Sequence, residues 1–177
     1  MKEINGREIL VWIGILAASA VLAYSMSGGG NHNHANLKGQ PIGDLKLRDA
    51  DGKVLDLSQK KGRTVVLNVY ATWCPPCRAE IPDFALFHKD AQAADAPIEV
   101  YGVVFESGEP AEATKESRKL GVSYPILLGN QTMAQTFGLH IYPTTIVVNP
   151  EGIITHQFEG QVDYNWLRDA AGAPNKS

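Results

Sequence analysis

The chain has 177 residues, of which 44% are hydrophobic and 20% are charged, an ordinary composition for a globular domain. This length allows one domain with a short appendage and is sufficient for a sizeable hydrophobic core. The net charge of −3 at pH 7 leaves no excess of basic residues, so we expect no nucleic-acid partner.

The first feature along the chain is an apolar segment. Residues 9–26 carry no charge, and as a helix they would extend about 27 Å, close to the thickness of the hydrocarbon core of a bilayer. Lys2 and Arg7 precede the segment and the next basic residue is Lys38, so the positive charges predict a cytoplasmic N-terminus and an exported remainder. A cleaved signal peptide is the alternative, because Ala18-Ser19-Ala20 resembles a cleavage site. The apolar run continues past that site, which favours an uncleaved signal-anchor.

The composition divides the chain into four segments. Residues 1–8 are the predicted cytoplasmic N-terminus and residues 9–26 the predicted transmembrane signal-anchor. Residues 27–40 are rich in Gly, Asn and His, which predicts a flexible linker that reaches roughly 20 Å. Residues 41–173 form the predicted folded domain.

The domain begins with a predicted β-hairpin, whose strands at 44–47 and 54–57 flank a turn containing Gly52. The following pattern alternates between strands and helices. We expect strands at 64–71, 98–105, 123–128, 144–148 and 153–158, and helices from the CxxC at 74 to about 91, at 110–120, 132–137 and 164–171. Alternation of this kind predicts an α/β fold with a parallel core, to which the last two strands add an antiparallel hairpin.

Cys74 and Cys77 are the only cysteines of the chain, and they lie where a predicted strand gives way to a helix. A single CxxC in this position indicates a redox dithiol. Zinc would need further ligands, and a structural disulfide would close a longer loop, so we expect no metal and no other cofactor. The first turn of a helix stabilises a thiolate, which makes such a cysteine a nucleophile at neutral pH.

Several motifs in order resemble the membrane-anchored TlpA/ResA/CcmG-like thiol–disulfide oxidoreductases of the thioredoxin superfamily. The resemblance covers about residues 40–172. It rests on Trp73-Cys74-Pro75-Pro76-Cys77, Pro82, the strand end Val103–Ser107, the central insert at 119–128 and the loop Ile141–Thr145. It implies a thioredoxin-like fold, in which a central mixed sheet is flanked by helices, with an N-terminal β-hairpin and a central insert. It also implies a bacterial inner-membrane protein whose catalytic domain lies on the periplasmic side.

The resemblance assigns roles to the residues of these motifs. Cys74 would be the exposed attacking thiol, and Cys77 would resolve the mixed disulfide. Trp73 would cover the dithiol. Pro143 is expected to be cis, and Tyr142 before it to pair with the backbone of the substrate.

Glu106 and the two prolines of the CxxC add to this site. We expect the Glu106 carboxylate to be partly buried beside the dithiol and to take the proton of Cys77. The alternative is a solvated loop residue, because residues 107–110, which follow the strand directly, are Ser-Gly-Glu-Pro. Pro75 and Pro76, which would also contact the substrate, supply no backbone N–H. The Cys74 thiolate would then be stabilised less than in a strong oxidant, which favours a reductant.

The leading hypothesis is an envelope protein-disulfide reductase. By analogy with the family, a membrane donor of the DsbD/CcdA type would supply electrons, and apocytochrome c or copper-site cysteines would be the targets. One alternative is a Cu(I)-binding metallochaperone that uses Cys74, Cys77 and His140, since soft thiolates suit Cu(I). The other is a disulfide-forming oxidase of the DsbA type. A thiol peroxidase is disfavoured, because Ala71 stands where peroxiredoxins place a threonine.

Overall fold

The computed structural model describes residues 37–173. The predicted cytoplasmic N-terminus, the predicted signal-anchor at 9–26 and most of the predicted linker lie outside the described residues. Within 37–173, no helix combines the length and apolar character that crossing a membrane requires.

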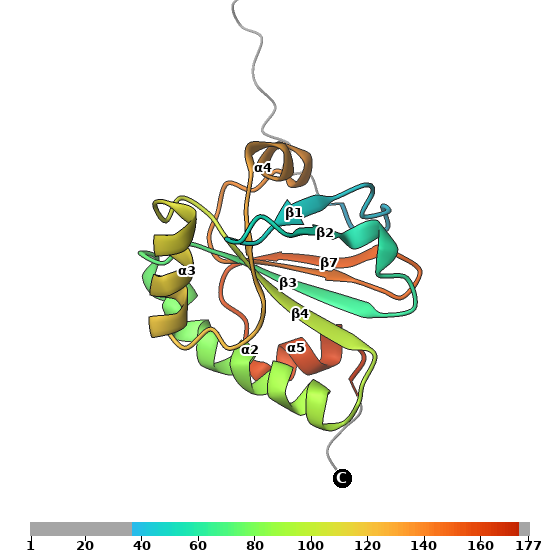
Figure 1. The fold of residues 1–177 in the computed structure, drawn as a ribbon. Coiled ribbons are helices and arrows are strands. Elements are labelled where there is room, and N and C mark those ends of the chain that lie inside the picture. Colours follow the sequence, from blue (N-terminus) through green and yellow to red (C-terminus); the bar gives the residue numbers. More distant parts are fainter. Residues whose placement is uncertain (1–36, 174–177) are drawn as a thin grey trace, which may run out of the picture. The chain divides into compact units, whose positions relative to one another are not determined.

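A seven-stranded mixed sheet forms the centre of the domain (Figure 1). In spatial order, the strands are β2 (Val54–Asp56), β1 (Lys46–Arg48), β5 (Ile126–Leu128), β4 (Ile98–Val104), β3 (Thr64–Tyr70), β6 (Thr144–Val148) and β7 (Ile154–Glu159). Strands β3, β4 and β5 are parallel, whereas β1, β2, β6 and β7 each run antiparallel to their neighbours. The predicted parallel core and C-terminal hairpin are therefore confirmed.

The two central strands place the functional loops. β3 and β4 are buried almost throughout, as expected for parallel strands covered on both faces. They pair in register from Thr64↔Ile98 to Tyr70↔Val104. The segments that follow them, which carry the CxxC and Glu106, therefore leave the sheet at the same edge.

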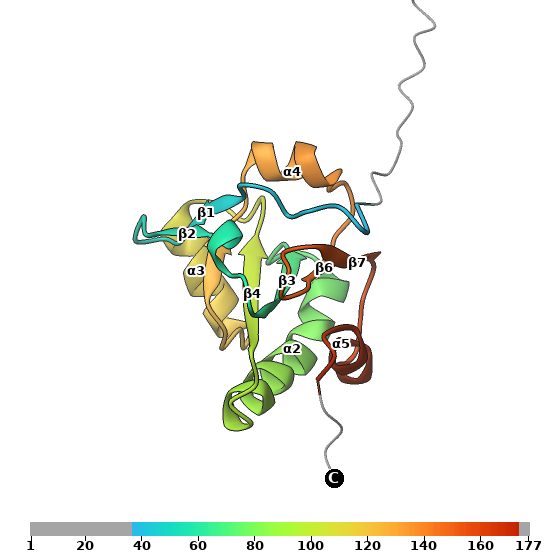
Figure 2. The ribbon, with the colours of Figure 1, turned by 90° about the vertical axis from the view of Figure 1, so that its right-hand side faces the viewer.

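Helices cover both faces of the sheet (Figure 2). α2 (Pro75–Ala93), α3 (Pro110–Lys119) and α5 (Tyr164–Ala170) contribute to the buried cluster of one face, and α4 (Gln131–Phe137) contributes to that of the other. Within α2 the buried residues recur at helical spacing, so the sheet stabilises the helix through one apolar face. Pro82 lies inside α2, as the resemblance implied.

Two local features differ from the prediction. A short 3₁₀ helix, η1 (Leu57–Gln59), follows β2, and the Asp56 side chain accepts a hydrogen bond from Ser58 N–H at its start. β5 begins at Ile126 rather than at residue 123. Tyr124 is fully buried, and Pro125 has no N–H for the ladder, although its carbonyl accepts the Gly102 N–H at 2.9 Å.

Candidate active site

The two cysteines begin helix α2 and form a disulfide. Cys74 is the N-cap residue, and Cys77 lies in the first turn, with the two Cα atoms 5.3 Å apart. The expectation of an exposed attacking thiol needs correction, because Cys74 is only 4% exposed. Cys77 is 0% exposed, so Cys74 is still the sulfur that a partner reaches first.

Few donors surround the Cys74 sulfur. Among the residues that the structure describes, Cys77 provides the one backbone N–H that donates to Cys74 Sγ, at 3.3 Å. Pro75 and Pro76 occupy the first two helical positions and have no N–H to offer. The carbonyl oxygen of Tyr142 lies 3.7 Å from the same sulfur and would disfavour a negative charge there. The local geometry therefore supports a thiolate less than an ordinary helix N-terminus does.

The loop before β6 lies against the dithiol. Its Tyr142–Pro143 peptide bond is cis, which confirms the prediction for Pro143. The loop is fixed at both ends, because the Thr144 hydroxyl donates to the Ile141 carbonyl at 2.7 Å and Gly160 N–H donates to the Pro143 carbonyl at 2.8 Å. Such a fixed loop suits the docking of an extended polypeptide beside Cys74.

Exposed apolar side chains form a rim around the disulfide. Trp73 is 58% exposed and Ile141 is 42% exposed. The Trp73 indole packs edge-on against Tyr142, with ring centroids 6.3 Å apart, and Tyr142 in turn packs against Phe105 at 5.9 Å. Ile141 was not selected from the sequence, because an isoleucine in a loop gives no signal of its own. The rim is a surface that could bind the apolar part of a polypeptide substrate.

Glu106 is placed differently from the expectation. Its side chain is exposed rather than partly buried, and its backbone has a φ of 47°, in the left-handed region. Its carbonyl oxygen accepts the Trp73 indole N–H at 2.8 Å. Burial raises the pKa of Tyr142, and the Glu106 charge raises it further. The exposed carboxylate is thus near the aromatic rim, but it lacks the desolvation on which the predicted proton transfer relied.

The buried carboxyl of the site is Glu80, which the sequence analysis missed. It lies three residues after Cys77 on α2, hence on the same helix face, and is 0% exposed. Asn68 Nδ2 donates to its Oε1, and Val162 N–H donates to its Oε2 at 3.2 Å. Burial raises the pKa of Glu80 to about 8, although both hydrogen bonds oppose this rise. Its place beside Ile81 on the buried face was the available signal.

The copper hypothesis directs attention to the possible metal ligands of the described residues. Residues 37–173 contain no group of three or more His, Cys, Asp or Glu side chains that could hold a metal ion. His140 is exposed and precedes Ile141 in the cis-proline loop.

A disulfide at a helix N-terminus, a cis-proline loop against it and a buried carboxyl one turn away together define a protein that exchanges thiols and disulfides. Comparison with known proteins supplies the family. Residues 38–157 match the AhpC/TSA family, and the chain belongs to it.

Individual relatives narrow the activity. The thiol-disulfide oxidoreductase ResA of Bacillus subtilis is 30% identical over 134 residues, which are 75% of this chain and 73% of ResA. The thiol:disulfide interchange protein DsbE of Vibrio cholerae is 31% identical over 141 residues, 76% of this chain and 72% of DsbE. A solved structure described as a DsbE-type protein, from Chlorobium tepidum, superposes with a TM-score of 0.65 at 25% identity and covers 75% of this chain and 94% of its own. The predicted thioredoxin-like fold and thiol–disulfide oxidoreductase activity are thereby confirmed.

Proposed function

We propose that this oxidoreductase is a protein-disulfide reductase that acts outside the cytoplasm. The observation that carries the direction of electron flow is the poor support for a Cys74 thiolate, which has one donor N–H at 3.3 Å and a carbonyl oxygen at 3.7 Å. An oxidant of this class owes its strength to a stabilised reduced form. A dithiol with little stabilisation of its thiolate gives up its electrons more readily.

The reaction that we propose begins at Cys74. Its thiolate attacks one sulfur of the target disulfide, forms a mixed disulfide and releases the other target sulfur as a thiolate. The Cys77 thiol then passes its proton to the Glu80 carboxylate and attacks Cys74 Sγ. This step re-forms the Cys74–Cys77 bond present in the structure and releases the second target thiolate. Two electrons have then moved from the dithiol to the target.

Glu80 is the better candidate for the proton acceptor of this step. Its pKa, raised by burial to about 8, is close to that of an ordinary thiol, so a proton can pass between the two groups at small cost. Only the carboxylate form accepts a proton, so the rate of resolution should rise with pH through this range. Glu106 is the second candidate for the proton acceptor, and its charge raises the pKa of Tyr142 beside the dithiol.

The substrate surface that we propose is the apolar rim with the cis-proline loop. Trp73, Ile141 and Tyr142 would contact apolar side chains of the target, and Pro75 and Pro76 would border the same surface. Pro143, held in place by Gly160, would keep the backbone next to Tyr142 available for pairing. Exported proteins with a cysteine pair, such as apocytochrome c or a copper-site protein, are the targets that we propose.

The proposed location is the extracytoplasmic side of a bacterial inner membrane, with residues 9–26 as a single-pass anchor. A dithiol there becomes oxidised unless it receives electrons, so we propose a membrane donor of the DsbD/CcdA type. Extraction of membranes with carbonate, followed by protease treatment of spheroplasts, tests this location. Release of the protein by carbonate or its protection from protease would contradict it.

The reduction potential of the protein tests the proposed direction of electron flow. It is measured by equilibration with dithiothreitol and glutathione buffers. A value at or below about −270 mV supports the reductase, and a value near −120 mV would instead establish a disulfide-forming oxidase. The copper alternative predicts a different result. One equivalent of Cu(I) retained by the reduced protein, and lost in a Cys74→Ser variant, would favour a metallochaperone.

A further inference from the structure

The central insert makes a chain of hydrogen bonds with the buried carboxyl of the site. Tyr124, which follows α3, donates its hydroxyl hydrogen to Asn68 Oδ1 at 3.1 Å. The other end of the same amide, Nδ2, donates to Glu80 Oε1. All three side chains are fully buried. A residue of the insert therefore contacts the site through a single amide.

The hydroxyl of Tyr124 decides which way this amide faces. A phenol has one hydrogen to donate, and among the described residues Asn68 Oδ1 is its acceptor. If the amide turned over, its NH₂ group would face the phenol and the hydroxyl hydrogen would lose its acceptor in a buried position, at a substantial cost. The Asn68 NH₂ group is consequently kept toward Glu80.

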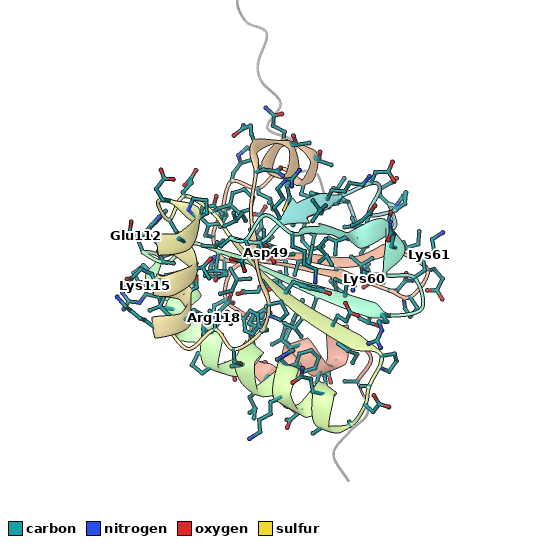
Figure 3. All side chains as sticks on the ribbon, viewed as in Figure 1. Asp49, Lys60, Lys61, Glu112, Lys115 and Arg118 are labelled. Carbon is teal, nitrogen blue, oxygen red and sulfur yellow. A yellow bond between two sulfur atoms is a disulfide. The ribbon has the colours of Figure 1, made fainter. Side chains whose placement is uncertain are left out.

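Residues of β4, α2 and α3 hold Tyr124 firmly in its place. The ring packs against Gly102, where an added Cβ would lie 3.0 Å from it, and against Phe84 at a centroid distance of 6.1 Å. Arg118 donates from one guanidinium nitrogen to the carbonyl oxygens of Val122 and Tyr124, at 2.6 and 2.9 Å. Figure 3 shows Arg118 on the inner side of α3, whereas Glu112 and Lys115 point outward. The backbone that carries Tyr124 is thus fixed by the helix before it.

We propose that Tyr124 is a positioning residue for Glu80, because its hydroxyl orients the Asn68 amide so that it donates to the carboxylate. This inference rests on the proposed function in so far as Glu80 exchanges a proton with Cys77. With its NH₂ group toward Glu80, the Asn68 amide favours the charged carboxylate, because a carboxylate accepts hydrogen bonds and donates none. Without the hydroxyl, Asn68 can turn its oxygen toward Glu80 and accept from the protonated carboxyl instead.

The charged and titratable groups around Tyr124 and Glu80 are not altered when the Tyr124 hydroxyl is removed. Burial raises the pKa of both Tyr124 and Tyr70, so neither phenol is charged near neutral pH. The charge of Asp83, on the same helix, raises the pKa of Glu80, and the charge of Arg118 opposes the rise in the pKa of Tyr124. The His88 ring lies 6.2 Å from that of Tyr124. A Tyr124→Phe substitution changes none of these charges.

Tyr70 provides the matched control. It is equally buried, packs against the same Gly102, and its hydroxyl donates to Ser117 Oγ at 2.7 Å instead of to the Asn68 amide. Tyr70→Phe and Tyr124→Phe each remove one buried, hydrogen-bonded hydroxyl. Both should lose a similar amount of stability, but only Tyr124→Phe should affect Glu80.

The experiment is a pH titration of the Glu80 carboxyl by carbon NMR in the full protein, together with the pH profile for reduction of a protein disulfide. In Tyr124→Phe, the Glu80 pKa and the rising limb of the profile should move upward by roughly half a pH unit or more, the equivalent of one hydrogen bond. Both should stay unchanged in Tyr70→Phe. In an Asn68→Ala background, Tyr124→Phe should produce no further movement.

The outcomes separate this proposal from the proposed function. An unmoved Glu80 titration in Tyr124→Phe, or equal movement in Tyr70→Phe, overturns the positioning role. Movement of the titration without movement of the rate profile supports the positioning role and instead contradicts the assignment of Glu80 as proton acceptor. If the Asn68→Ala background still responds to Tyr124→Phe, the amide is not the link and the proposal fails.

Discussion

The indole N–H of Trp73 donates to the carbonyl oxygen of Glu106 across 2.8 Å. The two residues follow the ends of neighbouring parallel strands, β3 and β4, so the sheet brings together positions that are 33 residues apart. Glu106, whose carbonyl oxygen binds the exposed indole, has a backbone φ of 47°. The interaction keeps the largest apolar side chain of the rim next to the disulfide.

Substitution of Trp73 by Phe should weaken the binding of protein substrates. The change removes the donor to Glu106 but leaves an aromatic ring that is no longer fixed at the rim. The free energy of one hydrogen bond sets the upper limit of the effect, a roughly three- to tenfold rise in KM. Reduction of the enzyme by dithiothreitol should be unaffected, because a small thiol does not need the rim. Steady-state kinetics with a protein disulfide and with dithiothreitol make this comparison.

Glu106→Gly is the companion variant, since it keeps the carbonyl and permits the positive φ. We expect its KM to equal that of the original protein. A rise as large as that of Trp73→Phe would show that the Glu106 carboxylate itself contributes to the binding of the substrate.

The stability of the oxidised protein should fall as pH rises because of Glu80. Its pKa is about 8 in the folded state against 4.5 when exposed, so between these values the folded state binds more protons than the unfolded state. The stabilisation is therefore complete below about pH 4.5 and lost by about pH 8, on the order of 3 kcal/mol between pH 5 and pH 8. Urea unfolding at several pH values measures it.

The neutral variant Glu80→Gln isolates this contribution. Its free energy of unfolding should vary less across the same pH range, because the remaining groups titrate alike in both proteins. Parallel pH curves for the two proteins would contradict the raised pKa.

Gly129→Ala should displace the Phe105 ring that supports Tyr142 at the rim. A Cβ at Gly129 would lie 2.1 Å from the ring of Phe105, the ring on which Tyr142 packs. The ring must move, which should cost about 1–3 kcal/mol of stability. Phe105→Leu in the same background should recover part of this loss. Thermal unfolding and substrate KM record both effects, and an unchanged Gly129→Ala protein would refute the argument.

Pro76→Ala should make the protein a stronger oxidant. The substitution restores an N–H at the second helical position, from which an N-cap side chain commonly accepts. One added hydrogen bond to the Cys74 thiolate, about 1–2 kcal/mol, raises the reduction potential by roughly 20–40 mV. Pro75→Ala is the control, since the first helical N–H is not the usual donor to this side chain. Equal potentials in all three proteins would remove the basis for the proposed direction.

Much of the domain could be predicted from local sequence signals. The apolar run at β3 and the CxxC after it placed the dithiol, because strand and helix periodicities and the start of a helix are properties of neighbouring residues. The hairpin of β6 and β7 followed in the same way from the turn that contains Gly152. The cis bond at Pro143 came from a family resemblance rather than from periodicity.

Only the tertiary structure decided which carboxyl is buried. Glu80 and Glu106 are both acidic residues near the CxxC, but α2 turns Glu80 into the core while the end of β4 leaves Glu106 in solvent. Helical spacing places Glu80 on the face of α2 that carries Cys77 and Ile81, but its partners Val162 and Asn68 are distant in sequence, and only the tertiary structure brings them to the carboxyl. The sequence by itself therefore determined the redox chemistry and the order of the elements. The packing of the insert and of the 160–163 loop onto α2 determined the groups that tune that chemistry, because a pKa depends on neighbours in space.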